Sequence, residues 1–119
     1  MIRENNREKG SRYESMAAVY LEKKGCRILE RNYKRSTGEI DLILKDGLYL
    51  VFVEVKYRKN QTLGTSLEAV TPTKQRRILR TAQYYMTEHG ISDTTPCRFD
   101  VVGVDGTVIS HVKNAFGGI

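Results

Sequence analysis

The chain of 119 residues has the length of a single domain. Its 39% hydrophobic and 29% charged residues are typical of a globular protein and exclude a disordered or collagen-like chain. No apolar run approaches the roughly 20 residues that a membrane helix needs. The first residues contain no apolar segment of a secretory signal, so we expect a cytoplasmic protein without membrane association.

The charge is strongly basic, because 20 Lys and Arg residues face 14 Asp and Glu residues and leave a net charge of +6. A small basic domain favours polyanionic partners, of which nucleic acid is the commonest inside cells. Half of the basic residues fall within 31–35, 56–59 and 74–80. These stretches form a binding site if they meet in space, and a solvated surface if they do not.

The two cysteines, Cys26 and Cys97, lie in apolar stretches and are predicted to be reduced thiols in the core. Together with His89 and His111 they lack the spacing of zinc ligands. Neither a disulfide nor a structural zinc site is therefore expected.

The first periodic segment predicts an amphipathic helix over residues 7–24. Its apolar side chains recur at i, i+3, i+4, i+7 and i+8, which is the stripe of a helix that faces a core. They are Tyr13, Met16, Ala17, Tyr20 and Leu21. Gly25 follows two lysines and ends the helix. A strand over residues 26–33 is predicted next.

Two further strands, over residues 39–45 and 48–56, flank an Asp46-Gly47 pair and predict a β-hairpin. A two-residue loop at 46–47 pairs Asp41 with Phe52. The core face of this hairpin consists of alternating apolar side chains. They are Ile40, Leu42, Leu44, Tyr49, Val51, Val53 and Val55. The opposite face is apolar near the turn as well, so both faces of the sheet are expected to be covered.

The rest of the chain predicts a helix and a second hairpin. Residues 57–70 are expected to be mostly loop, with a break at Gly64. A helix starts at Pro72 after the N-cap Thr71 and runs to about residue 89. Strands over 97–104 and 107–112 flank a turn at 105–106.

We expect the hairpin–helix–hairpin order to set strand 97–104 parallel to strand 48–56. The chain is thus predicted to be one α/β domain with an αβββαββ order. It contains a mixed five-stranded sheet flanked by helices. Residues 1–8 are expected to be a frayed terminus and residues 117–119 a tail.

Three charged residues gather on one face of the first hairpin. In the predicted register Asp41 and Glu54 are diagonal neighbours, roughly 7–8 Å apart at the backbone, and Lys56 follows Glu54 on the same side. Two carboxylates and a lysine are suited to Mg²⁺-assisted hydrolysis of a phosphodiester. A purely structural pairing of Asp41 with Lys56 is an equally weighted alternative.

Two glutamates are further candidates for this site. Glu14 lies at the edge of the apolar stripe of the first helix, where it can face the charged end of the hairpin or be an ordinary boundary residue. Glu39 is predicted to lie opposite Glu54. It either joins the acidic cluster or caps the start of its strand.

The order Asp41…Glu54-x-Lys56 resembles the PD-(D/E)-x-K nuclease superfamily, and the chain more closely resembles the YraN family of small bacterial restriction-endonuclease-like proteins. The resemblance runs from about residue 10 to residue 116. It is carried by the stretches 38–43, 51–58, 68–71, 74–77 and 98–102, and by His111 with residues 114–116.

This resemblance implies a restriction-endonuclease-like fold akin to archaeal Holliday-junction resolvases, with Mg²⁺ or Mn²⁺ at the acidic cluster. It implies that Asp41 and Glu54 are metal ligands, Lys56 the catalytic lysine and Glu14 a helix-borne acid of the same catalytic site. The expected activity is metal-dependent cleavage of DNA phosphodiesters, with branched or repair substrates among the options. A non-catalytic nucleic-acid-binding module and a structural adaptor are the alternatives.

The basic stretches supply the predicted nucleic-acid contacts. Lys74 and Arg77 lie three residues apart on one helical face, and with Gln75 they start a helix whose N-terminus can hold a phosphate. Arg35 and Arg58 belong to the other two stretches. A solvated basic face is an equal alternative. The sequence leaves the oligomeric state open, with a homodimer among the options.

Overall fold

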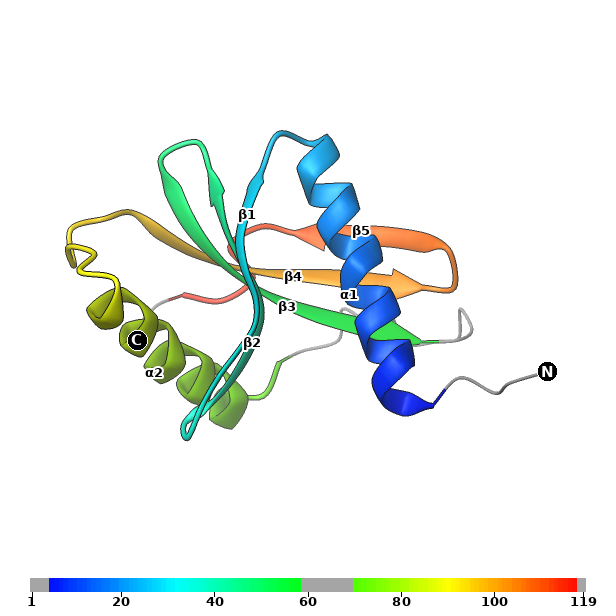
Figure 1. Ribbon diagram of the computed structural model, residues 1–119, viewed down its shortest axis with the longest axis horizontal. Coiled ribbons are helices and arrows are strands. Elements are labelled where there is room, and N and C mark those ends of the chain that lie inside the picture. The colour runs from blue at the N-terminus through cyan, green and yellow to red at the C-terminus, as the bar shows by residue number, and fades with distance from the viewer. Residues whose placement is uncertain (1–4, 59–69, 118–119) are drawn as a thin grey trace.

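The computed structural model describes residues 5–58 and 70–117, which form two helices and a five-stranded sheet (Figure 1). The elements are α1 (Asn6–Lys23), β1 (Arg27–Arg35), β2 (Gly38–Asp46), β3 (Tyr49–Arg58), α2 (Pro72–Glu88), β4 (Cys97–Asp105) and β5 (Val108–Val112). The strand order is β1-β2-β3-β4-β5, with β3 and β4 parallel and the other neighbours antiparallel. The predicted αβββαββ order and mixed sheet are confirmed.

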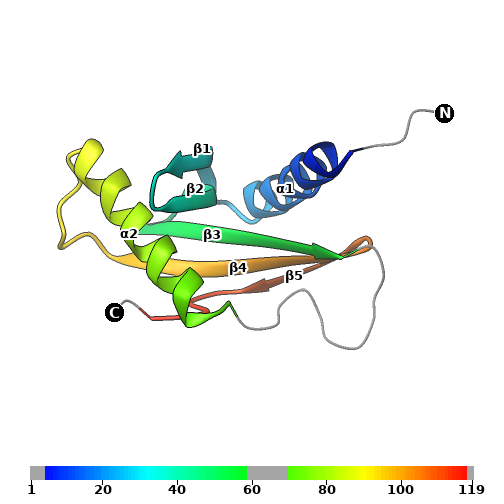
Figure 2. The same cartoon turned by 90° about the horizontal axis from the view of Figure 1, so that it is seen from below.

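Both faces of the sheet are covered, α1 packing on one face and α2 on the other (Figure 2). On the α1 face, Ala17 and Leu21 pack in one cluster with Leu42, Val53 and other strand residues. On the α2 face, a second cluster includes Ile78, Ala82 and Tyr85 with Ile43 and Phe52. The apolar residues on both faces of β2 and β3 therefore bury against different helices, as expected for a covered sheet.

The helix starts follow from their capping residues. Asn5 caps α1 in a reciprocal capping box with Glu8, so residues 6–8 are helical although we expected them to belong to a frayed terminus. Thr71 caps α2, with Pro72 in the first turn, as predicted.

Both hairpins turn later than predicted. Asp46 pairs with Tyr49 and Asp105 with Val108, so the loops are residues 47–48 and 106–107. Each loop starts at a glycine, with φ of 60° at Gly47 and 64° at Gly106. The second loop residues, Leu48 and Thr107, do not have a positive φ. A positive φ at the first loop residue alone is the pattern of a type II′ turn. The register moves by two residues, and a shift of two leaves the paired side chains of the hairpins on their predicted faces of the sheet.

Three predictions about the strands were wrong. Ile40 packs in the α2 cluster, although we expected it on the face of Leu42. Tyr49 is 45% exposed instead of buried. Tyr57 and Arg58 continue β3 and are not loop. The remainder of that predicted loop, with the break at Gly64, falls on residues 59–69 and lies outside the described residues.

A buried ionic network fixes the β4–β5 end of the sheet. The Asp100 carboxylate is 1% exposed and accepts hydrogen bonds from Arg98 Nε at 2.9 Å and His111 Nε2 at 2.8 Å. It also accepts a bond of 2.9 Å from the backbone N–H of Asn114. Burial acts to raise the pKa of Asp100, but the bonds from His111, Arg98 and Asn114 hold it below its usual range. Arg98 also reaches Asp46 at 2.9 Å and so ties β4 to the end of β2.

Asp100→Asn should destabilise the fold by about 3 kcal/mol at pH 7, because it leaves Arg98 buried without its main counter-charge. Urea unfolding measures this loss. The depressed pKa means that the ionised carboxylate stabilises the wild type above pH of about 4, and that this contribution disappears as acid protonates Asp100. The matched control is Asp46→Asn, which removes a 29% exposed carboxylate from the same arginine. It should cost about 1 kcal/mol or less, and an equal loss in both variants would contradict the prediction.

Candidate active site

The candidate site lies where β2 and β3 separate. Their paired register ends at Leu42 and Val53, and its next pair would set Asp41 opposite Glu54. Beyond this point the Asp41 side chain replaces a backbone hydrogen bond between the strands. Its Oδ2 accepts a hydrogen bond of 2.8 Å from the backbone N–H of Val55. A carboxylate is thereby fixed at a fork in the sheet, between the two strands.

Two further carboxylates approach Asp41 at this fork. Glu39 comes from the same strand and Glu14 from α1, and one oxygen of each acid lies within 4.8 Å of the others. We call Glu14, Glu39 and Asp41 the acidic triad. Glu14 and Asp41 are half-buried and Glu39 is exposed. The structure thus brings Glu39, which the sequence left open, into the site.

Burial and the neighbouring acids make Asp41 hard to ionise. Burial, followed by the nearby carboxylates of Glu54, Glu14 and Glu39, raises the pKa of Asp41 to about 8 against the opposing effect of the bond from Val55. Burial also raises the pKa of Glu14, with Glu39 and Glu54 adding smaller contributions. A cation among these groups would relieve the repulsion.

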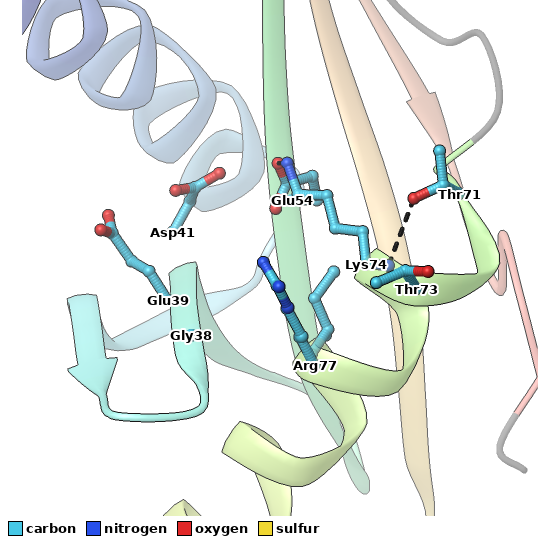
Figure 3. A pocket seen from close by; sticks show the side chains of 9 residues that line it. Gly38, Glu39, Asp41, Glu54, Thr71, Thr73, Lys74 and Arg77 are labelled. Carbon is cyan, nitrogen blue, oxygen red and sulfur yellow. Dashed lines mark hydrogen bonds and ion pairs between the residues drawn. The ribbon is translucent and has the colours of Figure 1, made fainter.

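Glu54 lies beside the triad with a partner of its own. Its side chain is 9% exposed, and its Oε1 accepts a bond of 2.6 Å from Lys74 Nζ at the start of α2. Asp41, Glu54, Lys74 and Arg77 line one pocket of about 540 Å³ on the α2 side (Figure 3). Asp41 and Glu54 therefore face a common pocket, which agrees with the shared face of the hairpin that the sequence predicted. The observed register, extended by one pair, would set them opposite each other and not diagonally.

A second pocket of about 680 Å³ opens on the α1 side of the fork, and Glu39 lines both pockets. Its other charged lining residues are Arg7, Glu14 and Lys34. Basic side chains thus lie next to the acidic triad on both sides.

The predicted catalytic lysine, Lys56, and two of the predicted nucleic-acid contacts do not line the pocket of Asp41 and Glu54 among the described residues. Lys56 is half-buried on the strand face of Glu54. Gln75 donates to the backbone carbonyl of Val70 at 2.8 Å and so supports the start of α2. Arg35 pairs with Glu88 at 3.0 Å. The side chain of Arg58 lies outside the described part of the chain. The nucleic-acid roles of these residues remain predictions.

Asn32 was not predicted from the sequence, but its side chain forms a hydrogen bond to Glu14 of the triad. Asn32 lies in β1 with a φ of 54°, in the left-handed region, and lines the second pocket with Glu14 and Glu39. A hydrogen bond from its side chain acts to lower the pKa of Glu14. An asparagine inside a strand was the available signal, because asparagine is enriched in this strained conformation.

The described chain is thus an α/β domain with an acidic site at the fork of a mixed sheet. None of its helices within the described ranges is long and apolar enough to cross a membrane. Residues 13–104 match the Uncharacterised protein family UPF0102, to which the chain belongs. This is the family that the sequence motifs indicated under the name YraN.

The matched relatives carry the same family name. A UPF0102 protein of Lachnoclostridium phytofermentans is 48% identical over 112 residues, which cover 94% of this chain and 95% of that protein. One of Nitrosococcus oceani is 44% identical over 99 residues, covering 83% of this chain and 80% of that protein. One of Colwellia psychrerythraea is 42% identical over 114 residues, covering 92% and 88% respectively.

Asp41→Asn should stabilise the metal-free protein at alkaline pH. The pKa of Asp41 is raised on folding, so its ionisation costs stability above its unfolded pKa of about 4, and this cost grows until pH passes the folded value. At pH 9 in EDTA we expect a gain on the order of 2 kcal/mol, which shrinks towards pH 5. Urea unfolding at both pH values measures it, with the exposed Asp93→Asn as control. A variant less stable than wild type at pH 9 would be incompatible with this account.

Asn32→Gly should raise the pKa of Glu14 further without unfolding the protein. Glycine adopts a φ of 54° without strain, so the fold is kept while the side-chain hydrogen bond is lost. A ¹³C NMR titration of the glutamate carboxyls reads this directly. Asn114→Gly is the matched control, because Asn114 has a φ of 53° and its backbone N–H donates to Asp100. Equal shifts of Glu14 in both variants would show that Asn32 does not act on Glu14.

Proposed function

We propose that this protein binds nucleic acid and hydrolyses DNA phosphodiesters with Mg²⁺ or Mn²⁺, as a member of the PD-(D/E)-x-K nuclease superfamily. The observation that supports this most is the acidic triad, whose oxygens gather within 4.8 Å at a fork between two pockets that each carry two basic side chains. A carboxylate cluster in a chain of net charge +6 has no evident use in holding a polyanion unless a cation lies between them.

The donor set fits a hard divalent cation. All three triad residues offer carboxylate oxygens, which Mg²⁺ and Mn²⁺ prefer over nitrogen and sulfur. The supporting groups are also present, because Val55 fixes the Asp41 carboxylate and Asn32 holds Glu14. The pKa of Asp41 is raised by burial first and by the neighbouring carboxylates second, so a cation at this place would favour its ionised form.

Each part of the site has a role in this reaction. Mg²⁺ would supply a Lewis acid that polarises the phosphodiester and makes water more acidic. Glu14, Glu39 and Asp41 would hold it. Lys56, from the sequence motif, and Lys74, from the pocket, are both candidates to stabilise the negative charge that grows on the phosphate in the transition state.

The two pockets suggest how the substrate lies. Lys74 and Arg77 line the pocket on the α2 side, and Arg7 and Lys34 line the pocket on the α1 side. Ammonium and guanidinium groups bind phosphate oxygens and release counterions from the nucleic acid. A strand that passes the triad would therefore be held by phosphate contacts on either side, with an affinity that falls steeply with salt.

The test is cleavage of labelled duplex, single-stranded, flap and four-way DNA with Mg²⁺, Mn²⁺ or EDTA. We expect cleavage only with a divalent ion, and Asp41→Asn should slow it by about 100-fold or more. Asp93→Asn, which changes an exposed acid distant in sequence from the site, should keep the wild-type rate.

Two results would contradict the proposal. Salt-dependent binding without cleavage under any ion would favour the non-catalytic binding module. Cleavage that survives Asp41→Asn at the wild-type rate would place the activity outside the acidic triad.

A further inference from the structure

The candidate site has two places for a positive charge. One lies at the acidic triad, and the other is held by the Lys74 ammonium at Glu54. Lys74 is the third residue of α2, and its ammonium reaches across the pocket to Glu54 (Figure 3). The lysine side chain is 46% exposed, whereas the Glu54 side chain is 9% exposed. The carboxylate is thus the buried member of the pair, and the cation reaches it from the solvent side.

Glu54 needs a cation whether or not the triad holds one. A carboxylate this deeply buried is costly unless it is paired, and it lies close enough to raise the pKa of Asp41. Its oxygens do not belong to the set within 4.8 Å that the acidic triad forms. An ion held by the triad would therefore not neutralise Glu54, which needs a second positive charge. In the structure the ammonium of Lys74 supplies that charge.

We infer that the ammonium of Lys74 takes the place of a second divalent ion, so that the site holds one ion per chain. This inference rests on the proposed function and specifies its metal stoichiometry. Two-metal nucleases place their ions roughly 3.5–4 Å apart and share carboxylates between them. Here the carboxylate that would serve a second ion is already bound to a lysine.

The charges of the α2-side pocket agree with a single ion. Its charged lining residues are the acids Glu39, Asp41 and Glu54 and the bases Lys74 and Arg77. One divalent ion added to the two bases already exceeds the three negative charges. A second divalent ion would add two more positive charges unless Lys74 left Glu54, so displacing the lysine is the cost of binding it.

The experiment counts bound ions. Mn²⁺ is titrated into the protein, and EPR measures the free ion. We expect one bound Mn²⁺ in the wild type and two in Lys74→Met, because the methionine leaves Glu54 available as a ligand. Arg77→Met removes a cation from the same pocket without a contact to Glu54, and should still bind one. Lys74→Arg keeps a cation and should also bind one.

A second measurement, made in EDTA, is independent of metal and of activity. Lys74→Met should lower the melting temperature, since Glu54 stays buried without a partner, and Glu54→Gln added to it should restore most of the loss. The double variant also serves if Lys74→Met folds poorly, and it should bind one Mn²⁺, because it lacks both the lysine and the second carboxylate.

The outcomes separate the two proposals. One ion in both the wild type and Lys74→Met, or two in the wild type, would overturn this inference and leave the nuclease proposal standing. No coupling between Lys74 and Glu54 in EDTA would also overturn it. Failure of every variant to bind Mn²⁺ would end both proposals.

Discussion

The hydrogen bond from the backbone of Val55 to Asp41 holds the site open, because it replaces a rung of the sheet with a charged side chain. Strands that continued to pair would leave no space between β2 and β3. Where they separate, the freed backbone groups need partners, and Asp41 satisfies one of them. The resulting fork is accessible from both faces of the sheet. Glu14 can therefore approach from α1 and Lys74 from α2, although the two helices lie on opposite faces.

This arrangement concentrates negative charge in a protein whose net charge is positive. Burial and like charges at close range both destabilise the ionised form of Asp41, and its raised pKa reflects both costs. The surrounding structure offsets it with Lys74 on Glu54 and with the bond from Asn32 to Glu14. Conformational strain at Asn32 and electrostatic strain at Asp41 thus occur together, as they often do where a protein keeps groups for binding or chemistry at the expense of stability.

The sequence could predict the elements and their faces because both depend on local periodicity. It misplaced both hairpin turns, treating Asp-Gly as the loop where the loop starts at Gly47 or Gly106. An error of two residues is harmless to the faces, since side chains alternate with a period of two, whereas an error of one would have moved Asp41 to the other face. The shared face of Asp41 and Glu54 was therefore predictable even though their pairing was not.

The rest of the site could not be predicted because it depends on contacts between distant segments. Ile40 breaks alternation where its strand leaves its neighbour, and Asn32 meets Glu14 only once β1 and α1 have packed. Lys74 shows what local rules can still indicate. A cation in the first turn of a helix lies at the positive end of the dipole, and α2 has no acid there to balance it. Such a local inconsistency calls for a compensating partner elsewhere, and in the folded chain that partner is the buried carboxylate of Glu54.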